Sequence, residues 1–277
     1  MPGTPYEKAA LYDVSLEIQE GETLGIIGAT GSGKSTFIQH LNGLIKLSKK
    51  SKKTSSIRVF DINLNVRKPD YRTLRQTVGL VFQYPEYQLF DETVAKDVGF
   101  GPRNLKLPKE KIDERVKQAI ELVGLDYSEV AEKSPFELSG GQKRRAAIAG
   151  VIAMRPRVLI LDEPTAGLDP RGKREILDLI QKFKMTCPTI IIISHDMDEI
   201  AAISDRIAVF EHGRIVYHLP PKELFGKASE LQEMGLDIPA TIKIANALKS
   251  KKIDLKDIPV RKSELAHLIL NKYEGRK

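Results

Sequence analysis

The sequence predicts an α/β fold built around a mainly parallel sheet. Three short apolar runs, 158–161, 189–193 and 206–210, have the near-continuous hydrophobic character of strands that are buried on both faces. A helical stretch over 173–183 separates the first two runs, and such strand–helix–strand alternation is typical of parallel sheets. A fourth apolar run, 24–27, leads through a glycine-rich loop into a helix.

Composition and charge allow several classes of protein without selecting one. The 277 residues can bury a core of one or two domains, and 41% hydrophobic and 29% charged residues are ordinary for a globular protein. The net charge of +7 would suit nucleic acid or an anionic membrane surface. Five lysines fall within 46–53, and such a run is most simply a solvated loop. Charge alone therefore does not decide the function.

Cysteine usage and hydropathy limit the cellular context that we expect. Cys187 is the only cysteine, which excludes an internal disulfide and suits a reducing compartment. Residues 1–7 lack the apolar region of a secretory signal, and no stretch approaches the roughly 20 apolar residues that span a bilayer. We expect any membrane role to come through a partner.

The N-terminal part predicts strands on both sides of the glycine loop. Residues 11–20 alternate apolar and polar side chains, which is the pattern of a half-buried strand. The helix after the loop should end near Asn42–Gly43. Strands follow over 57–60 and over 78–82, and the second of these ends at Gln83.

Residues 84 to about 150 predict a mostly helical insertion between two strands. Glycine and proline interrupt its first part, at Pro85, Gly99, Gly101, Pro102 and Pro108. Apolar side chains then recur at helical spacing over 110–123, and a second helix should run over 140–154.

The C-terminal part predicts a hairpin and then helices. His212–Arg214 should turn the chain into a short strand over 215–217. From Pro220 the pattern is helical over 222–225, 240–250 and 262–272, with breaks at Pro239 and Pro259.

The glycine-rich loop matches the phosphate-binding pattern of glycine, four residues and Gly-Lys-Ser. Its predicted contact residues are Gly28, Ala29, Thr30, Gly31, Ser32, Gly33, Lys34, Ser35 and Thr36. Glycines let successive backbone N–H groups converge on an anion, and the following helix adds the positive end of its dipole. Lys34 would reach the β- and γ-phosphates, while the Ser35 hydroxyl would coordinate Mg²⁺. A glycine turn that contains Gly-Lys-Ser by chance is the alternative.

Two carboxylates, Asp162 and Glu163, close the apolar run 158–161, at the sheet edge where ligands of parallel sheets bind. Asp162 would hold Mg²⁺, directly or through water. Glu163 would accept a proton from the attacking water or orient it. A solvated acidic turn is the alternative interpretation.

Two further polar residues follow buried strands. His195 comes directly after the apolar run 189–193, where a neutral imidazole could hydrogen-bond a γ-phosphate. Gln83 has the same place after strand 78–82 and could bind Mg²⁺ or the attacking water. Taken alone, His195 would more often be structural, and Gln83 is no more informative than any polar loop residue.

A second glycine motif precedes the helix over 140–154. It consists of Ser139, Gly140, Gly141 and Gln142, a hydroxyl and two glycines at a helix start. Since one phosphate loop already serves one nucleotide, this second cradle makes chemical sense if it closes on a nucleotide held by another chain. A glycine turn ahead of a basic helix is the alternative.

The order of these motifs over residues 9–218 resembles an ATP-binding cassette (ABC) ATPase. The phosphate loop corresponds to Walker A, Gln83 to the Q-loop and Leu138–Gln142 to the signature, followed by Walker B at 161–164. Gly167-Leu168-Asp169 and His195 match the D-loop and the switch histidine. The resemblance implies a P-loop NTPase fold of ABC ATPase type. Besides the parallel core, this fold has an antiparallel β edge, a helical subdomain and a C-terminal helical extension.

The same resemblance implies a head-to-tail dimer with ATP and Mg²⁺ as cofactors. Two ATP molecules would lie between Walker A of one subunit and the signature of the other. Ser139 and Gly141 would then act in trans, and Asp169 would couple the two sites. An aromatic residue upstream of Walker A usually stacks on adenine, for which Tyr6 is the first candidate and Tyr12 the second.

Narrower features resemble the ATPases of energy-coupling factor (ECF) importers for vitamins or transition-metal ions. They are the extended Q-loop 83–90, Phe100-Gly101-Pro102, Ser134–Glu137, the stretch 165–172 and Gly235–Pro239. The stretch 165–172 is similar to the second of the two paralogous ATPases of those complexes. The implied partners are a second ABC ATPase subunit, either a paralogue or another copy, a transmembrane T component and a membrane substrate-binding S component, but no nucleic acid. The implied location is peripheral, at the cytoplasmic face of the cell membrane.

The resemblance also implies the domain boundaries, and it leaves two alternative functions to consider. We expect a nucleotide-binding domain over 1–218, with a helical subdomain at about 84–155, and a C-terminal extension over 219–277 that aids dimerisation. The family normally has a further strand before residue 5, where this sequence begins with Met1–Pro5, so we expect either an altered sheet edge or an upstream start; the usual glycine before strand 57–60 is replaced as well. One rival is a soluble ABC-type ATPase acting on DNA or ribosomes, which the basic charge would suit. Another is a regulatory binder without hydrolysis, which Glu163 and His195 argue against.

Overall fold

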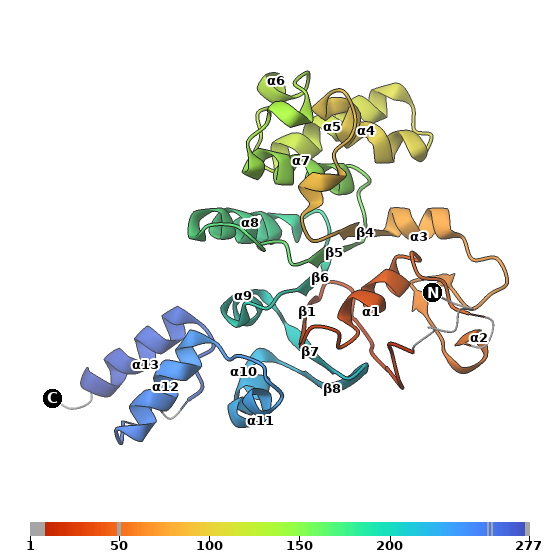
Figure 1. Cartoon of the computed structure of the whole chain (residues 1–277). Coiled ribbons are helices and arrows are strands. Elements are labelled where there is room, and N and C mark those ends of the chain that lie inside the picture. The colour runs from red at the N-terminus through yellow and green to blue at the C-terminus, as the bar shows by residue number, and fades with distance from the viewer. Residues whose placement is uncertain (1–8, 49–50, 254, 256, 275–277) are drawn as a thin grey trace. The chain divides into compact units, whose positions relative to one another are not determined.

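The computed structural model describes residues 9–48, 51–253, 255 and 257–274 (Figure 1). Contacts within the chain define two compact units. The first comprises residues 35–190, and the second joins residues 9–34 to residues 191–274 among those described. Helix α1 (Lys34–Leu41) and strand β6 (Thr189–Ile193) cross the division.

The first unit contains four strands and seven α-helices besides the crossing elements, counted over the described residues. They are α2 (Ser51–Thr54), β2 (Arg58–Val59), β3 (Ile62–Asn63), α3 (Tyr71–Thr77), β4 (Val78–Val81), α4 (Val94–Asn104), α5 (Lys109–Leu122), α6 (Tyr127–Val130), α7 (Gly140–Ile152), β5 (Val158–Asp162) and α8 (Pro170–Phe183). Two short 3₁₀ helices, η1 (Pro85–Gln88) and η2 (Pro135–Glu137), complete the unit.

The strands β4 and β5 pair in parallel, from Val78 opposite Val158 to Val81 opposite Leu161. Every residue of β4 is buried, as the apolar run predicted. At the start of β4, Asn42 Nδ2 donates a hydrogen bond to the Val78 carbonyl at 2.5 Å. Because the strands are parallel, the residues that follow Val81 and Leu161 leave the sheet at the same edge.

Helices α4, α5 and α7 pack against one another in the first unit (Figure 1). The sequence did not predict α4, since glycine and proline disfavour helix interiors. Tertiary packing overrides that preference: a Cβ at Gly101 would lie 2.7 Å from Met154 Cγ, and one at Gly99 would lie 3.3 Å from Val116. The glycines thus let α4 approach its neighbours closely.

The second unit is built on parallel and antiparallel strand pairs. Its remaining elements are β1 (Thr23–Gly28), α9 (Met197–Ile203), β7 (Arg206–Glu211), β8 (Arg214–Leu219), α10 (Pro221–Phe225), α11 (Ala228–Glu233), α12 (Ala240–Ser250) and α13 (Lys262–Glu274). β1 pairs in parallel with β7, and β7 pairs antiparallel with β8. His212 and Gly213 both have positive φ, as a tight hairpin requires, so the predicted turn is confirmed.

The predicted strand over 11–20 is wrong. Residues 11–19 form no strand, although Leu11, Val14, Leu16 and Ile18 are less exposed than most of their neighbours. Asp13 has a φ of 52°, which interrupts the extended backbone. Next to it, Tyr12 N donates to the Gly213 carbonyl at 2.8 Å. Alternation therefore predicted which side chains are sheltered, but not a hydrogen-bonded ladder.

The expected fold class is confirmed: mostly parallel strands, an antiparallel edge strand and helices form a mixed α/β structure. None of the helices in the described part of the chain combines the length and hydropathy needed to span a bilayer.

Candidate functional site: a phosphate loop and an exposed signature turn

The phosphate loop begins at Gly28, which only glycine can occupy. Gly28 is the last residue of β1 and lies opposite Phe210 of β7. Its φ is +149°, and a Cβ there would lie 2.2 Å from the Phe210 carbonyl oxygen. Any side chain would therefore force β1 and β7 apart.

The loop itself is a narrow turn that depends on two more glycines. Gly31 has a φ of +80° and Gly33 a φ of +106°, and a Cβ at Gly33 would lie 2.8 Å from the Ala10 carbonyl oxygen. Between them Ser32 is 5% exposed, and its Oγ has no hydrogen-bond partner among the described residues. A buried hydroxyl without a partner is costly, and a bound phosphate oxygen would satisfy it.

Lys34 lies over this loop. Its side chain is buried, and Nζ donates hydrogen bonds to the carbonyl oxygens of Gly28 at 2.5 Å and Ala29 at 3.0 Å. Two of the acceptors that contact the ammonium group are thus neutral carbonyl oxygens of the loop. A phosphate would offer it a charge-assisted bond, which is about twice as strong. The unsatisfied Ser32 hydroxyl, the glycine cradle and Lys34 together fit a triphosphate.

His195 lies in the same unit, immediately after β6. Asp196 caps the following helix α9 by accepting from Glu199 N, while Ser194 Oγ accepts from Asp196 N at 3.0 Å. Partial desolvation lowers the pKa of His195, and the positive charge of Lys34 lowers it further. Both effects favour the neutral imidazole, which still has one N–H that can donate a hydrogen bond to a phosphate oxygen.

The Walker B carboxylates lie at the end of β5 in the first unit. Leu161 is fully buried, Asp162 and Glu163 are half-buried, and Glu163 has a left-handed φ of 52°. A non-glycine residue in this region stores strain, and such residues concentrate at active sites. The Glu163 carbonyl accepts from Ala166 N at 3.1 Å, which starts the turn toward the D-loop.

Gln83 leaves the sheet at the same edge as Glu163. It lies two residues beyond Val81 of β4, and Glu163 lies two residues beyond Leu161, the parallel partner of Val81. The side chain of Gln83 is exposed, and Tyr84 after it has a φ of 55°. The parallel register thus places Gln83 and Glu163 after neighbouring strands at the same edge of the sheet.

A magnesium site of the predicted kind uses few protein ligands. No group of three or more His, Cys, Asp or Glu side chains forms a metal site within the described residues. Mg²⁺ needs no such cluster, because phosphate oxygens and water complete its shell. Asp162 carries a carboxylate, and Ser35 and Gln83 have exposed oxygen-bearing side chains that suit the same ion.

The signature turn begins α7 with a capping box. Ser139 Oγ accepts from Gln142 N at 3.3 Å, and Gln142 Oε1 accepts from Ser139 N at 3.0 Å. Ser139, Gly140 and Gly141 are exposed, and a Cβ at either glycine would meet nothing within 4 Å. Packing within the described chain therefore gives no reason for glycine at these two positions.

Asp169 also begins a helix. Its carboxylate caps α8 by accepting from Gly172 N at 2.8 Å, and the residue is exposed. The D-loop therefore has a fixed backbone and an open surface.

Sequence reasoning missed Arg144, which connects three of these motifs. Arg144 is 2% exposed and forms a two-bond ion pair with Glu86 of η1. Its Nη1 also donates to the carbonyl oxygens of Pro164 at 3.3 Å and Ala166 at 2.8 Å. A signal existed, because Arg144 lies four residues before the buried Ile148 and hence on the buried face of α7.

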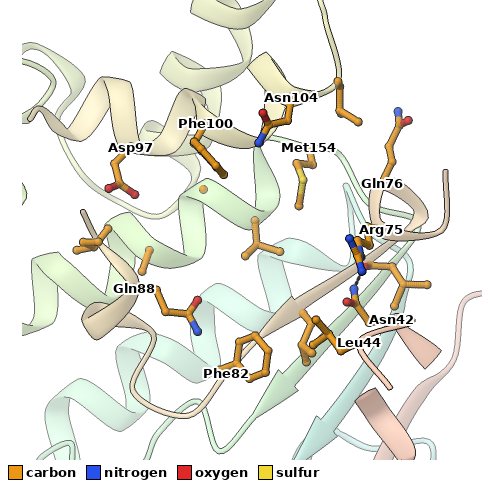
Figure 2. A pocket seen from close by; sticks show the side chains of 18 of the residues that line it. Asn42, Leu44, Arg75, Gln76, Phe82, Gln88, Asp97, Phe100, Asn104 and Met154 are labelled. Atoms are coloured by element: carbon orange, nitrogen blue, oxygen red, sulfur yellow. Dashed lines mark hydrogen bonds between the residues drawn. The ribbon is translucent and has the colours of Figure 1, made fainter. Parts of the chain in front are cut away.

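A groove opens beside the Q-loop in the first unit (Figure 2). The cavity has a volume of about 650 Å³, and most of its lining is apolar. Phe90 and Phe100 line it with rings 5.1 Å apart in an edge-to-face arrangement, and both are exposed. Arg72 and Arg75 of α3 supply positive charge. Exposed aromatic side chains around a groove are typical of protein interaction sites.

The adenine contact stays a prediction. Tyr6, the first candidate, lies outside the described residues. Tyr12, the second, is 42% exposed, and the Arg214 guanidinium lies 6.0 Å from its ring centroid.

Fold and site define a P-loop ATPase of the ABC class, and a family model described as "ABC transporter" matches residues 11–166. The chain belongs to this family. It is 50% identical to the energy-coupling factor transporter ATP-binding protein EcfA2 of Symbiobacterium thermophilum, over all of this chain and 94% of that protein. EcfA2 of Clostridium perfringens is 49% identical, over 98% of this chain and 95% of its own length.

Solved structures are similar as well. CbiO1 from Clostridium perfringens, described as part of the ABC transporter complex CbiONQ, has a TM-score of 0.67 and 41% identity. The match covers 82% of this chain and 88% of that one. A dimeric ATP-binding cassette in a post-hydrolysis state with ADP and Pi has a TM-score of 0.66 and 27% identity, over 78% and 94% of the two chains. The expected resemblance to ECF ATPases is confirmed, and the rival action on DNA or ribosomes is not favoured.

Proposed function

We propose that this chain is the ATP-binding and ATP-hydrolysing subunit of an ECF-type importer for vitamins or transition-metal ions. The proposal depends on one observation about Lys34: its side chain is buried over a loop whose glycines have positive φ. The neighbouring Ser32 hydroxyl has no hydrogen-bond partner among the described residues. Its full-length relatives are named as ATP-binding proteins of such transporters, and that supports the transport role.

The phosphate loop binds the triphosphate. Residues 28–36 surround the β- and γ-phosphates, and Lys34 exchanges its carbonyl partners for phosphate oxygens. Ser35, Gln83 and Asp162 would hold Mg²⁺, which neutralises phosphate charge when bound.

Glu163 and His195 act on the attacking water and the γ-phosphate. The Glu163 carboxylate, which directly follows β5 in the chain, accepts the proton that the water loses. His195 donates a hydrogen bond from its ring N–H to a γ-phosphate oxygen. Gln83 helps to orient the water and responds to loss of the phosphate.

The exposed signature turn completes a site on a second ABC ATPase, either a paralogue or another copy. Ser139, Gly140, Gly141 and Gln142 would contact the nucleotide of that subunit, and Asp169 would couple the two sites. Among the residues that the structure describes, nothing packs against a Cβ at either glycine, which supports this function in trans. The nucleotide-binding domain would span residues 1–218 and include a helical subdomain at about 84–155. The extension over 219–277 would add contacts between the two ATPases.

The groove beside the Q-loop would accept a helix of the transmembrane T component. Its exposed aromatic rings offer apolar contact, and its connection to Gln83 through residues 84–88 would transmit nucleotide state. A membrane S component would select the transported molecule. The chain would thus be peripheral, at the cytoplasmic face of the membrane.

Replacement of Glu163 by Gln tests the hydrolytic mechanism in the assembled transporter. The amide keeps the size of the side chain but cannot accept the proton, so ATP should still bind while turnover falls by about 10²–10⁴-fold. Lys34→Ala should fail at the binding step, before hydrolysis, so a binding titration should show reduced affinity for ATP. Wild-type turnover in Glu163→Gln would exclude Glu163 as the base. Unchanged ATP affinity in Lys34→Ala would remove the proposal's main support.

A further inference from the structure

A second cavity in the first unit is lined by positive charge. This cationic pocket has a volume of about 370 Å³. Its lining residues are Lys46, Leu47, Lys52, Arg67, Lys68, Pro69 and Tyr71. Four of these seven side chains are cationic and none is acidic, so their charges repel one another.

Neutral groups hold two of the four cations. Lys46 Nζ lies 5.0 Å from the centroid of the Tyr71 ring, and Lys52 Nζ donates to the Val66 carbonyl. Within the described residues, none of the four forms an ion pair with a carboxylate. Asp70, beside the pocket in sequence, caps α3 by accepting from Arg72 N and Thr73 N. A ligand with negative charge would therefore relieve the repulsion.

An exposed apolar side chain belongs to the segment that forms the cationic pocket. Val66, whose carbonyl accepts from Lys52 Nζ, directly precedes Arg67 and is 46% exposed. Cations beside exposed apolar side chains are typical of surfaces that bind anionic lipid membranes. A free phosphate gains nothing from such apolar side chains. Helix α3 also connects the pocket, through Tyr71, to Arg72 and Arg75 of the groove beside the Q-loop.

We propose that the cationic pocket binds the phosphate headgroup of an anionic phospholipid, with Val66 contacting the membrane interface. The choice of lipid over a free anion rests in part on the proposed transport function, which places the groove next to a membrane partner. Lys46 and Lys52 are thereby part of a membrane contact that needs no membrane-spanning helix.

Co-sedimentation of the full chain with vesicles tests this directly, without a membrane partner. The chain should bind vesicles of phosphatidylglycerol and phosphatidylcholine but not phosphatidylcholine alone. Each cation near an anionic surface contributes about 1 kcal/mol, so Arg67→Gln/Lys68→Gln should weaken binding by about 30-fold. Lys109→Gln/Lys111→Gln, which removes the same charge from exposed positions on α5, should weaken it by less than about threefold. An equal loss in the two double variants would overturn the proposal.

A second comparison separates lipid from free anion. Val66→Ser keeps every charge and should weaken vesicle binding by about fivefold, since burial of part of that side chain is lost. If pyrophosphate instead competes with the vesicles and Val66→Ser binds like the wild type, the pocket takes a free anion and the lipid proposal fails. ATP turnover of Arg67→Gln/Lys68→Gln in the assembled transporter tests the proposed function separately.

Discussion

Arg144 of α7 and Glu86 of η1 form a buried ion pair in which Nε and Nη2 of the arginine contact both carboxylate oxygens, at 3.0 and 2.9 Å. The remaining nitrogen, Nη1, reaches the carbonyl oxygens of Pro164 and Ala166. One side chain thus connects the signature helix, the extended Q-loop and the turn after Walker B. These segments are distant in sequence, so the arginine fixes their relative positions within the first unit.

Replacement of Arg144 by Ala should strongly destabilise the fold. It leaves the Glu86 carboxylate largely buried without its cation and frees two carbonyl oxygens. Breaking a buried pair in this way costs about 3–5 kcal/mol. Denaturant unfolding of the purified chain measures the loss.

The adjacent Arg145 provides the control. It lies 3.8 Å from Glu175 and is more exposed, so Arg145→Ala should lower the free energy of unfolding by less than about 1 kcal/mol. Equal losses for the two variants would mean that the Arg144 ion pair adds nothing beyond a surface contact.

The single cysteine should be inert in the folded chain. Cys187 is 1% exposed, and burial raises the pKa of its thiol to about 12. At pH 8 the thiolate fraction is then about 10³-fold below that of an unperturbed thiol, so alkylation should be slower by at least that factor. A colorimetric thiol assay should detect one thiol per chain in denaturant. Rapid reaction under native conditions would contradict the buried position.

Histidine burial makes stability fall as the pH drops below neutral. Burial lowers the pKa of His40, and burial followed by the charge of Arg206 lowers the pKa of His218. The unfolded chain therefore binds protons at a higher pH, near the ordinary value of 6.5, than the folded chain does. Between these pKa values the unfolded state holds more protons, so the free energy of unfolding decreases as the pH falls from about 7.

Urea unfolding at pH 8, 7, 6 and 5.5 measures this slope. Each histidine contributes at most about 1.4 kcal/mol per pH unit. His40→Gln/His218→Gln should flatten the slope, and its stability at pH 8 separates any packing loss from the protonation effect. The same slope in variant and wild type would assign the pH dependence to other groups.

Short sequence patterns predicted the strands and turns whose structure depends on residues close together in the chain. The apolar run 189–193 predicted its strand correctly, because a strand that is buried on both faces requires apolar residues. The glycine loop predicted its turn correctly, because a left-handed backbone favours glycine. Helix α4 was missed, since its glycines serve contacts with helices distant in sequence. The strand over 11–20 failed because alternation reports burial and not hydrogen bonding.

The residues of the candidate site also differ in how far the sequence predicted them. Sequence patterns gave Lys34, Glu163 and the signature glycines, since each has a chemical role at a fixed spacing. They did not give the contacts of Arg144, because three distant segments meet there. Nor could sequence alone give the unsatisfied hydroxyl of Ser32, which depends on its burial.

The glycines of the two anion-binding motifs should respond differently to alanine. At Gly28 a Cβ would lie 2.2 Å from the Phe210 carbonyl, so Gly28→Ala should reduce stability along with ATP binding. At Gly141 a Cβ meets nothing within 4 Å, and alanine favours the helix by up to about 1 kcal/mol. The melting temperature of Gly141→Ala should therefore equal or exceed that of the wild type.

Turnover then reveals whether Gly141 faces a nucleotide on another subunit. A methyl group at such a contact displaces the signature turn by about 1 Å, which costs roughly 10²-fold in rate. ATP hydrolysis by the assembled transporter should fall by that factor in Gly141→Ala, while ATP affinity of the isolated chain stays unchanged. Because the described part of the chain leaves this glycine uncovered, a stable variant with lost turnover points to a contact from another subunit. Full turnover would mean that no nucleotide approaches the signature turn closely.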